Sequence, residues 1–337
     1  MSNQVYIVAE AGVNHNGDLK MALDLVEAAK KAGADAVKFQ TFFPGECTGK
    51  FAVKVNYLED AMEKDQTRYD LTSTYTLPIE DFKKIKAHCD KLGIEFITTP
   101  DGEESLKFIV EELGVKKIKT SSTDVTNLPF LKKIASYNIP IIFSTGLSTL
   151  GEIEQALHVM QQYHSNISIL HCISEYPAPP EEVNLRAIKT IREAFKLNVG
   201  FSDHTLGNDA AVGAVCFDAH IIEKHFTLDR NLNGPDHKAS LDPTELTAFV
   251  KAIRNAEKML GNGIKEPSIS EKENITGIRR SIVAKQDLKT GTVLTEELLA
   301  CKRPGYGIQP LDLEKVIGFK INTDLKEDQP LLWEHLR

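Results

Sequence analysis

The sequence has few cysteines, and they show no pairing pattern. Only five occur among 337 residues, an odd number at wide spacing and without a C-x-x-C pair. This spacing excludes both a disulfide framework and a zinc knuckle, so we expect reduced thiols and a cytoplasmic protein. Cys172 lies beside His171 at the end of an apolar run. We interpret its side chain as a small buried apolar group rather than as a nucleophile.

Long apolar runs and an excess of positive charge are also absent. No apolar stretch is long enough to cross a bilayer, and the N-terminus lacks a basic segment followed by an apolar core. We therefore expect neither membrane insertion nor export. Lys and Arg number 40 against 48 Asp and Glu, giving a formal net charge of -8. The basic residues are scattered, which argues against nucleic acid as a partner. The remaining composition is typical of a globular protein with a large core.

Eight short apolar runs alternate with helical patterns up to residue 260. We predict strands at 5–9, 36–40, 95–99, 117–122, 140–145, 167–172, 199–204 and 221–225. We predict helices after residue 18 and from Pro78, and at 103–113, 128–137, 150–163, 185–195, 209–216 and 243–260. Eight such units in about 260 residues indicate a (β/α)8 TIM barrel, whose active site lies at the carboxyl ends of the strands. Polar residues at many strand ends favour the barrel over a doubly wound sheet, which binds ligands at one switch point.

Two of the predicted strands end in histidine. His204 follows the run that begins at Val199, and His225 ends the run that begins at Ile221. A single histidine at a strand end is more often a hydrogen-bonded structural residue. Two imidazoles are too few for a closed structural zinc site, so a metal here would keep positions open for substrate and water. The pair therefore predicts a catalytic site for one divalent cation.

The barrel pattern stops near Gly261, and a different pattern follows. Residues 262–280 are polar and read as a linker with a helix start at Ser268 and Glu271. Residues 281–337 read as short strands and turns. A unit of under about 60 residues has a marginal core, so we expect it to lean on the barrel or on another subunit. The predicted domains are thus 1–261, a linker at 262–280, and 281–337.

Seven sequence blocks carry a family resemblance. In order they are Ala9–Gly17, Val37–Thr41, Ser144–Gly146, Ser202–Thr205, Glu223–Thr227, Gly234–His237 and Lys302–Gly305. Together they resemble the sialic acid synthase family, whose members condense phosphoenolpyruvate with N-acetylmannosamine or a related amino sugar. The resemblance covers nearly the whole chain. It implies a TIM barrel followed by a small antifreeze-like SAF domain of the β-clip type, swapped across a homodimer so that Arg303 reaches the partner's sugar site.

The resemblance also implies a reaction. His204 and His225 would hold Mn²⁺ or Mg²⁺, which polarises the aldehyde oxygen of the open-chain sugar. The methylene carbon of phosphoenolpyruvate attacks the aldehyde carbon, and water adds to the positive second carbon. The tetrahedral intermediate then expels phosphate by C–O cleavage. The chain is accordingly expected to be a transferase that makes a nine-carbon 2-keto acid and phosphate.

Further residues match family positions with assigned roles. Glu10 and Asp236 match residues that do general acid/base or water-orienting work. The phosphoenolpyruvate-binding positions are Lys38, Thr99, Lys119, Ser122, Ser144 and Ser202, and the sugar-binding positions are Gln40, Asp124, Tyr176 and Arg303. Two of these lysines lie in predicted buried strands, where an unpaired ammonium is costly, so a bound anion would explain both.

The sequence leaves the acceptor sugar open. Asp124 stands where several family members carry glutamate, and Ser174 where some carry asparagine. One acceptor is N-acetylmannosamine, giving N-acetylneuraminate. The other is 2,4-diacetamido-2,4,6-trideoxymannose, giving N,N'-diacetyllegionaminate, and the run at 235–240 favours it; the 6-phosphate of N-acetylmannosamine ranks below both.

Two rival functions rank below the synthase. A Schiff-base aldolase would use a desolvated lysine, and Lys38, Lys119 and Lys224 all lie on predicted strands. A non-catalytic carbohydrate- or ice-binding protein would act through residues 281–337. The second rival leaves the two histidines and the strand lysines unexplained.

Overall fold

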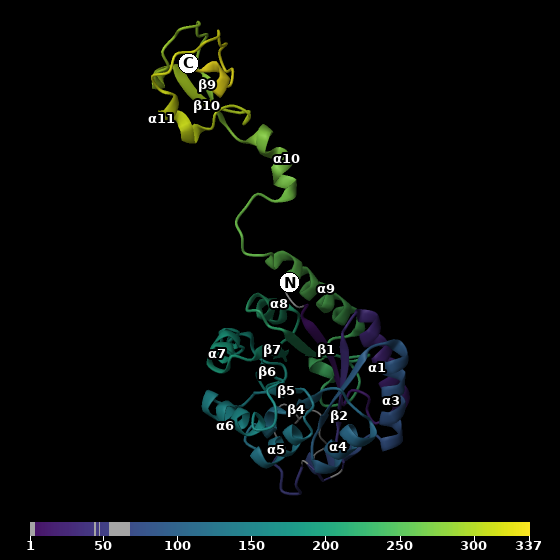
Figure 1. Cartoon of the computed structure of the whole chain (residues 1–337). Helices are drawn as coiled ribbons and strands as arrows, with labels where there is room; N and C mark the ends of the chain where they lie inside the picture. Colours follow the sequence, from purple (N-terminus) through teal and green to yellow (C-terminus); the bar gives the residue numbers. More distant parts are fainter. Residues whose placement is uncertain (1–3, 44, 47, 54–67) are drawn as a thin grey trace. The chain divides into compact units, whose positions relative to one another are not determined.

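The computed structural model describes residues 4–43, 45–46, 48–53 and 68–337. The chain forms two compact units, residues 1–261 and residues 262–337. Each unit has an apolar core of its own. In Figure 1 the helices of the first unit surround its strands. The candidate site lies within this first unit.

The first unit is a closed barrel of eight parallel strands. Each strand pairs with the next along the chain, and β8 closes the barrel against β1. Glu10 of β1 is in register with Lys38 of β2 and with His225 of β8. The strands are β1 Tyr6–Gly12, β2 Ala36–Thr41, β3 Glu95–Pro100, β4 Ile118–Thr120, β5 Ile141–Ser144, β6 Ile167–Cys172, β7 Asn198–Asp203 and β8 Ile221–His225. The predicted (β/α)8 barrel is confirmed.

Capping residues define where the helices between the strands begin and end. The last barrel helix starts with a capping box of Asp242 and Glu245 and has proline in its first turn. The first helix begins after the capping side chain of Asp18 and ends at Gly33 in the left-handed conformation. The helices are α1 Leu19–Ala32, α2 Arg68–Thr74, α3 Ile79–Leu92, α4 Glu103–Lys107, α5 Leu128–Ser136, α6 Leu150–Met160, α7 Arg186–Phe195, α8 Asp209–Cys216 and α9 Pro243–Leu260.

Some predicted boundaries were wrong. Strand β4 has three residues instead of six, because Ser121 caps a 3-10 turn over Ser122–Asp124 with its own side chain. The helix predicted over 103–113 divides into α4 and a π-helix at Phe108–Glu112. Helix α6 stops at Met160, three residues early, and α2 is a helix that the sequence analysis did not predict.

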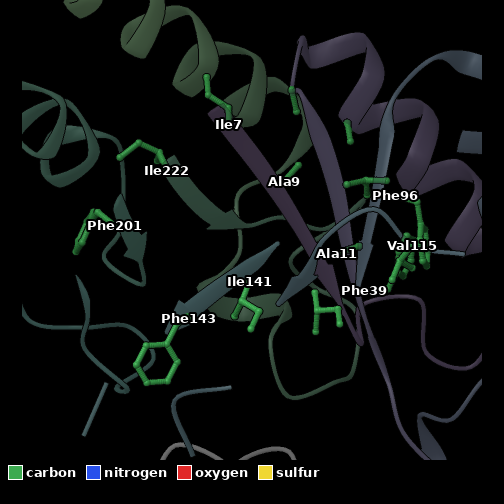
Figure 2. Close-up of a cluster of buried hydrophobic side chains, with 14 of the residues drawn as sticks. Ile7, Ala9, Ala11, Phe39, Phe96, Val115, Ile141, Phe143, Phe201 and Ile222 are labelled. Carbon is green, nitrogen blue, oxygen red and sulfur yellow. The ribbon is translucent and has the colours of Figure 1, made fainter. Parts of the chain in front are cut away.

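The barrel wall has two faces of different character. Outward-pointing side chains such as Ile7, Phe39 and Phe143, which Figure 2 labels, belong to an apolar cluster that the strands share with the helices. Inside the barrel, the layer nearest the amino ends of the strands is apolar and consists of Val8, Ala36, Ile97, Ile142, Leu170 and Ile221. Because successive strand residues alternate between the faces, the next inward positions towards the carboxyl ends lie directly above this apolar plug.

The second unit contains helix α10 (Ile269–Ile278), strands β9 (Ser281–Ala284) and β10 (Leu299–Lys302), and helix α11 (Leu313–Val316). The two strands are antiparallel. Helix α10 begins with the predicted capping box of Ser268 and Glu271. The core of the unit is aliphatic and is formed by Ile282, Ala284, Leu288, Leu294, Leu299, Ile308, Val316, Ile321, Leu325 and Leu331.

Two sequence expectations concern the chain as a whole. Within the parts of the chain that the structure describes, no helix combines the length and the apolar character needed to cross a membrane. Cys89, Cys172, Cys216 and Cys301 are free thiols, and Cys172 is buried, as interpreted from the sequence. Cys47 lies outside the described residues.

Candidate active site at the carboxyl ends of the barrel strands

A cluster of charged side chains lies inside the barrel above the apolar plug, with Glu223 at its centre. Its Oε1 atom is 3.3 Å from Lys38 Nζ and 3.5 Å from Lys119 Nζ, and it accepts a hydrogen bond of 2.9 Å from Ser202 Oγ. Lys119 Nζ also donates to Ser144 Oγ at 2.6 Å. All five side chains are buried. Four of them are predicted phosphoenolpyruvate-binding residues, and β2, β4, β5 and β7 bring them together around β8.

The two lysines differ in their electrostatic surroundings. Burial lowers the pKa of Lys119, and Glu223 opposes this only in part. Burial also acts against the charged form of Lys38, but Glu10 and Glu223 outweigh it and raise the pKa of Lys38 above its usual value. Burial alone would raise the pKa of Glu223, yet Lys119 and Lys38 hold it at about 2. Lys38 is therefore an ammonium group and Glu223 a carboxylate at neutral pH.

This arrangement corrects one inference from the sequence. A bound anion was the sequence-based explanation for the two buried strand lysines, whereas carboxylates of the chain itself already pair with them. Lys38 lies 3.2 Å from Glu10 Oε1 as well as 3.3 Å from Glu223. Strand alternation places Glu223 on the same inner face as His225, a signal that the sequence contained and that we assigned to no role. Glu223 is the main site residue missed by sequence reasoning.

Three polar side chains converge above this cluster, around Gly12. A Cβ atom at Gly12 would lie 3.3 Å from both Glu10 Oε1 and Asp236 Oδ2, and 3.5 Å from Gln40 Nε2. Gln40 donates to Glu10 at 3.2 Å. Burial raises the pKa of Glu10 to about 7 and that of Asp236 to about 6. Both carboxyl groups therefore titrate close to neutral pH, as groups that exchange protons in catalysis must.

The two predicted metal ligands are neighbours. The ring centroids of His204 and His225 are 5.5 Å apart, and the Tyr176 ring stacks on His204 at 4.1 Å. His204 Nδ1 donates to the Ile173 carbonyl at 2.6 Å, which leaves the lone pair of Nε2 available. Burial lowers the pKa of His204 to about 4 and that of His225 well below its usual value. Both imidazoles are neutral at pH 7, the form that binds a metal.

The residues around the histidines fit an open cation site and do not fit a closed one. Among the described residues, no group of three or more His, Cys, Asp or Glu side chains is arranged to hold a metal ion. His225 Nδ1 is buried without a hydrogen-bond partner in that part of the chain, and Asp236 Oδ2 lies 3.7 Å away. Two neutral imidazoles with a carboxylate nearby suit a divalent cation that keeps several positions for substrate and water.

A second polar group lies between β4, β5 and β6. The backbone N–H of Gly146 donates to Ser122 Oγ at 2.9 Å, and Ser122 Oγ lies 3.1 Å from Cys172 Sγ. A Cβ atom at Gly146 would lie 2.3 Å from Ser174 Oγ, so glycine is required here. Hydroxyl groups beside a backbone amide are suited to phosphate oxygens.

The remaining predicted residues occupy different places. Thr99 is in register with Gln40, and its Oγ1 is buried without a partner among the described residues. Asp124 lies in the turn after β4, where it accepts a hydrogen bond of 3.2 Å from Asn127 and burial raises its pKa. Arg303 belongs to the second unit, is exposed, and donates from Nε to the Ile278 carbonyl at 2.9 Å.

Lys224, the third lysine considered for a Schiff base, points away from the barrel interior. Its Nζ lies 3.0 Å from Asp203 Oδ2 and 5.8 Å from the centre of the Phe249 ring on α9. A substrate inside the barrel is therefore on the opposite side of the wall from this amine.

Comparisons with known proteins agree with the geometry. The NeuB family model matches residues 25–265, and the SAF domain model matches residues 279–337. The chain is 46% identical over 326 residues to N,N'-diacetyllegionaminic acid synthase of Campylobacter jejuni, covering 96% of this chain and 97% of that protein. It is 43% identical over 336 residues to the enzyme of the same name from Legionella pneumophila, covering 98% and 94%.

Comparison with a solved structure also indicates this family. N-acetylneuraminic acid synthetase from Leptospira borgpetersenii superposes with a TM-score of 0.71 and 34% identity, over 81% of this chain and 91% of that one. The family blocks, the closed barrel and these similarities lead to one conclusion. The chain belongs to the NeuB family, which is the sialic acid synthase family, and it ends in a SAF domain.

Proposed function

We propose that this chain is a nonulosonate synthase that condenses phosphoenolpyruvate with 2,4-diacetamido-2,4,6-trideoxymannose to give N,N'-diacetyllegionaminate and phosphate. The observation that carries the reaction class is the convergence of two lysines, two neutral histidines and two proton-exchanging carboxyl groups at one end of a barrel of this family. Identities of 46% and 43% to two legionaminic acid synthases favour this acceptor over N-acetylmannosamine.

The lysines and hydroxyl groups account for binding of phosphoenolpyruvate. Lys38 supplies a positive charge and Lys119 a further amino group, and Ser144 and Ser202 supply hydroxyl groups within 3 Å of the charged cluster. The Gly146 amide and the Ser122 hydroxyl offer further contacts to phosphate oxygens. Because Glu223 offsets part of the positive charge, the site is close to neutral before the substrate enters. It gains a negative charge when phosphoenolpyruvate binds.

That negative charge acts on the nearby carboxyl groups. An anion beside Lys38 disfavours ionisation of Glu10, whose pKa is already raised to about 7. Glu10 then holds a proton that it can donate to the alkoxide formed from the sugar aldehyde. Asp236, with a pKa of about 6, is ionised and can accept a proton from the water that adds to the second carbon. Gln40 and Tyr176 line the part of the same space in which the sugar would bind.

His204 and His225 would hold Mn²⁺ or Mg²⁺, which when bound supplies a Lewis acid for the aldehyde oxygen. The Ile173 carbonyl orients the His204 ring, and Tyr176 covers its face. The carbonyl contact fixes the tautomer of the ring, the tyrosine limits the access of bulk water to it, and burial keeps the imidazole neutral.

The proposal includes a homodimer that shares its SAF domains. The second unit (residues 262–337), which we call the SAF unit, exposes large apolar side chains. They include Leu311, Phe319 and Trp333, which a subunit interface would cover. In such a dimer Arg303 reaches the sugar site of the partner subunit and binds acceptor hydroxyl or carbonyl oxygens. We place the enzyme in the cytoplasm, since its described cysteines are free thiols.

The test is phosphate release from phosphoenolpyruvate in the presence of Mn²⁺. The acceptors compared are 2,4-diacetamido-2,4,6-trideoxymannose, N-acetylmannosamine and its 6-phosphate, with a chelator as the control. We expect metal-dependent release that is fastest with the trideoxy sugar. Faster release with N-acetylmannosamine would replace the acceptor and keep the reaction class. No release with any sugar would refute the synthase function, and trapping of a pyruvate adduct by borohydride would then favour the aldolase.

A further inference from the structure

The outer face of the barrel carries a buried ion pair where β7 and β8 end. Asp203 and Lys224 are partners in the strand register, and Lys224 Nζ lies 3.0 Å from Asp203 Oδ2. Asp203 is fully buried and Lys224 is 1% exposed. Phe249 of α9 covers the ammonium from the helix side. The pair therefore lies between the barrel wall and α9, outside the space that substrates enter.

Both members of the pair also hold the turn after β7. Asp203 Oδ1 accepts hydrogen bonds from the backbone N–H of Thr205 at 2.9 Å and from its hydroxyl at 2.8 Å. Lys224 Nζ donates to the carbonyl oxygen of the same threonine. Three polar groups of Thr205 are thus held by one ion pair that spans two strands.

The position of this pair in the sequence connects it to the histidines. His204 lies between Asp203 and Thr205, and His225 directly follows Lys224. Strand alternation turns the pair outwards and the two imidazoles inwards. Any change in the distance between the strand ends at this level changes the distance between the imidazoles.

Fold stability alone does not explain a charged pair at this place. Taking two charges out of water is costly, and replacing a buried pair by apolar side chains of similar size is often neutral or stabilising. An ion pair differs from an apolar contact in being directional, since it fixes the positions of named atoms. Groups that orient metal ligands typically change metal affinity by about 10-fold to 100-fold when they are removed.

We propose that Asp203, Lys224 and Thr205 form a positioning clamp that sets the spacing of His204 and His225 for a divalent cation. This inference rests on the metal site of the proposed function. The clamp residues touch neither substrate nor metal and act only through the two histidines.

The test compares two double variants. Asp203→Leu with Lys224→Met removes the clamp without leaving a charge unpaired. The matched control is Glu95→Leu with Lys117→Met, which removes a partly buried pair of 2.7 Å at the amino ends of the strands. Mn²⁺ binding to the full-length protein without substrates is measured by the loss of the free Mn²⁺ signal in electron paramagnetic resonance, and folding is measured by circular dichroism.

We expect the clamp variant to fold and to bind Mn²⁺ about 10-fold to 100-fold more weakly, while the control binds like the wild type. At saturating Mn²⁺ the clamp variant should regain most of its kcat, with an unchanged KM for phosphoenolpyruvate. Wild-type affinity in the folded clamp variant would overturn the clamp and leave the proposed function standing. A wild-type protein that binds no Mn²⁺ would overturn both.

A milder variant covers the case in which the double variant fails to fold. Thr205→Val removes only the hydroxyl bond to Asp203 and keeps the ion pair. A clamp predicts weaker Mn²⁺ binding, by about 3-fold to 10-fold, the size of one lost hydrogen bond of about 1 kcal/mol. Unchanged binding in this folded variant would count against the clamp.

Discussion

The two units of this chain use charge in opposite ways. The barrel buries Glu10, Lys38, Lys119, Asp203, Glu223 and Lys224. The SAF unit, by contrast, buries an aliphatic core and leaves every Asp, Glu, Lys and Arg side chain at least partly in solvent. Its ion pairs, such as Lys302 with Asp328, lie on the surface.

Burying charge costs free energy, so the difference between the units indicates where function lies. In the barrel, opposing charges balance one another and keep several groups close to their point of titration. In the SAF unit, the same residue types lie at the surface, where water solvates their charges.

The largest effect is expected from the metal ligands. His225→Ala should lower metal-dependent phosphate release by at least about 1,000-fold, because a Lewis acid contributes several kcal/mol to the transition state. The barrel should remain folded by circular dichroism. His335→Ala, in the SAF unit, is the control and should leave the rate unchanged. Full activity of His225→Ala would remove the metal from the mechanism.

Removing a buried lysine of the barrel should destabilise the protein more than removing a surface lysine of the SAF unit. Lys38→Met leaves Glu10 and Glu223 without their shared partner, so we expect a loss of about 3–5 kcal/mol in the free energy of unfolding. Lys302→Met removes a surface pair and should cost about 0–1 kcal/mol. Urea unfolding measures both. Equal losses in the free energy of unfolding would mean that the buried ion pairs matter no more to stability than the surface pair.

Arg303 tests whether the SAF unit contributes to catalysis at all. Arg303→Ala should raise the KM for the acceptor sugar by about 30-fold, the effect of losing an arginine worth about 2 kcal/mol, with little change in phosphoenolpyruvate binding. Mixing this variant with His225→Ala should restore part of the activity if the sites are shared between subunits. An Arg303→Ala enzyme with unchanged sugar kinetics would limit the SAF unit to a structural role.

Acid should weaken the barrel before the SAF unit. Burial lowers the pKa of His15 and His204 from 6.5 to about 4, and it lowers the pKa of His225 well below 6.5. Unfolded histidines take up protons below pH 6.5, whereas the folded ones resist until about pH 4. The stability that these groups give is therefore present above pH 6.5 and is lost as the pH falls towards 4.

Two carboxyl groups have the opposite effect on the pH dependence of stability. The raised pKa values of Glu10 and Asp236 mean that the folded barrel binds protons first, which stabilises it as the pH falls through 7 and 6. The histidines are more numerous, so we expect the free energy of unfolding of the barrel to fall as the pH is lowered. It should fall further in Glu10→Gln, which lacks the opposing effect of Glu10. Hydrogen exchange at pH 7 and pH 4.5 follows each unit separately. Faster exchange in the SAF unit than in the barrel at pH 4.5 would contradict the prediction.

Much of this architecture could be predicted from the sequence. Strand and helix patterns with periods of 2 and 3.6 residues identify eight units, and α9 and β6 have the predicted limits. The boundaries that failed are those set by local hydrogen bonds. The Ser121 side chain ends β4 early by capping a turn, and no periodicity records such a contact.

The barrel, the family blocks and the identity of most candidate residues follow from the sequence, because they depend on residue type and order along the chain. The charge state of the site depends instead on the folded barrel. The pairing of Lys38 with Glu10 and Glu223, the convergence of Glu10 and Asp236 at Gly12, and the clamp between Asp203 and Lys224 each join distant parts of the chain. A pKa depends on distances and burial, which exist only once the barrel has closed.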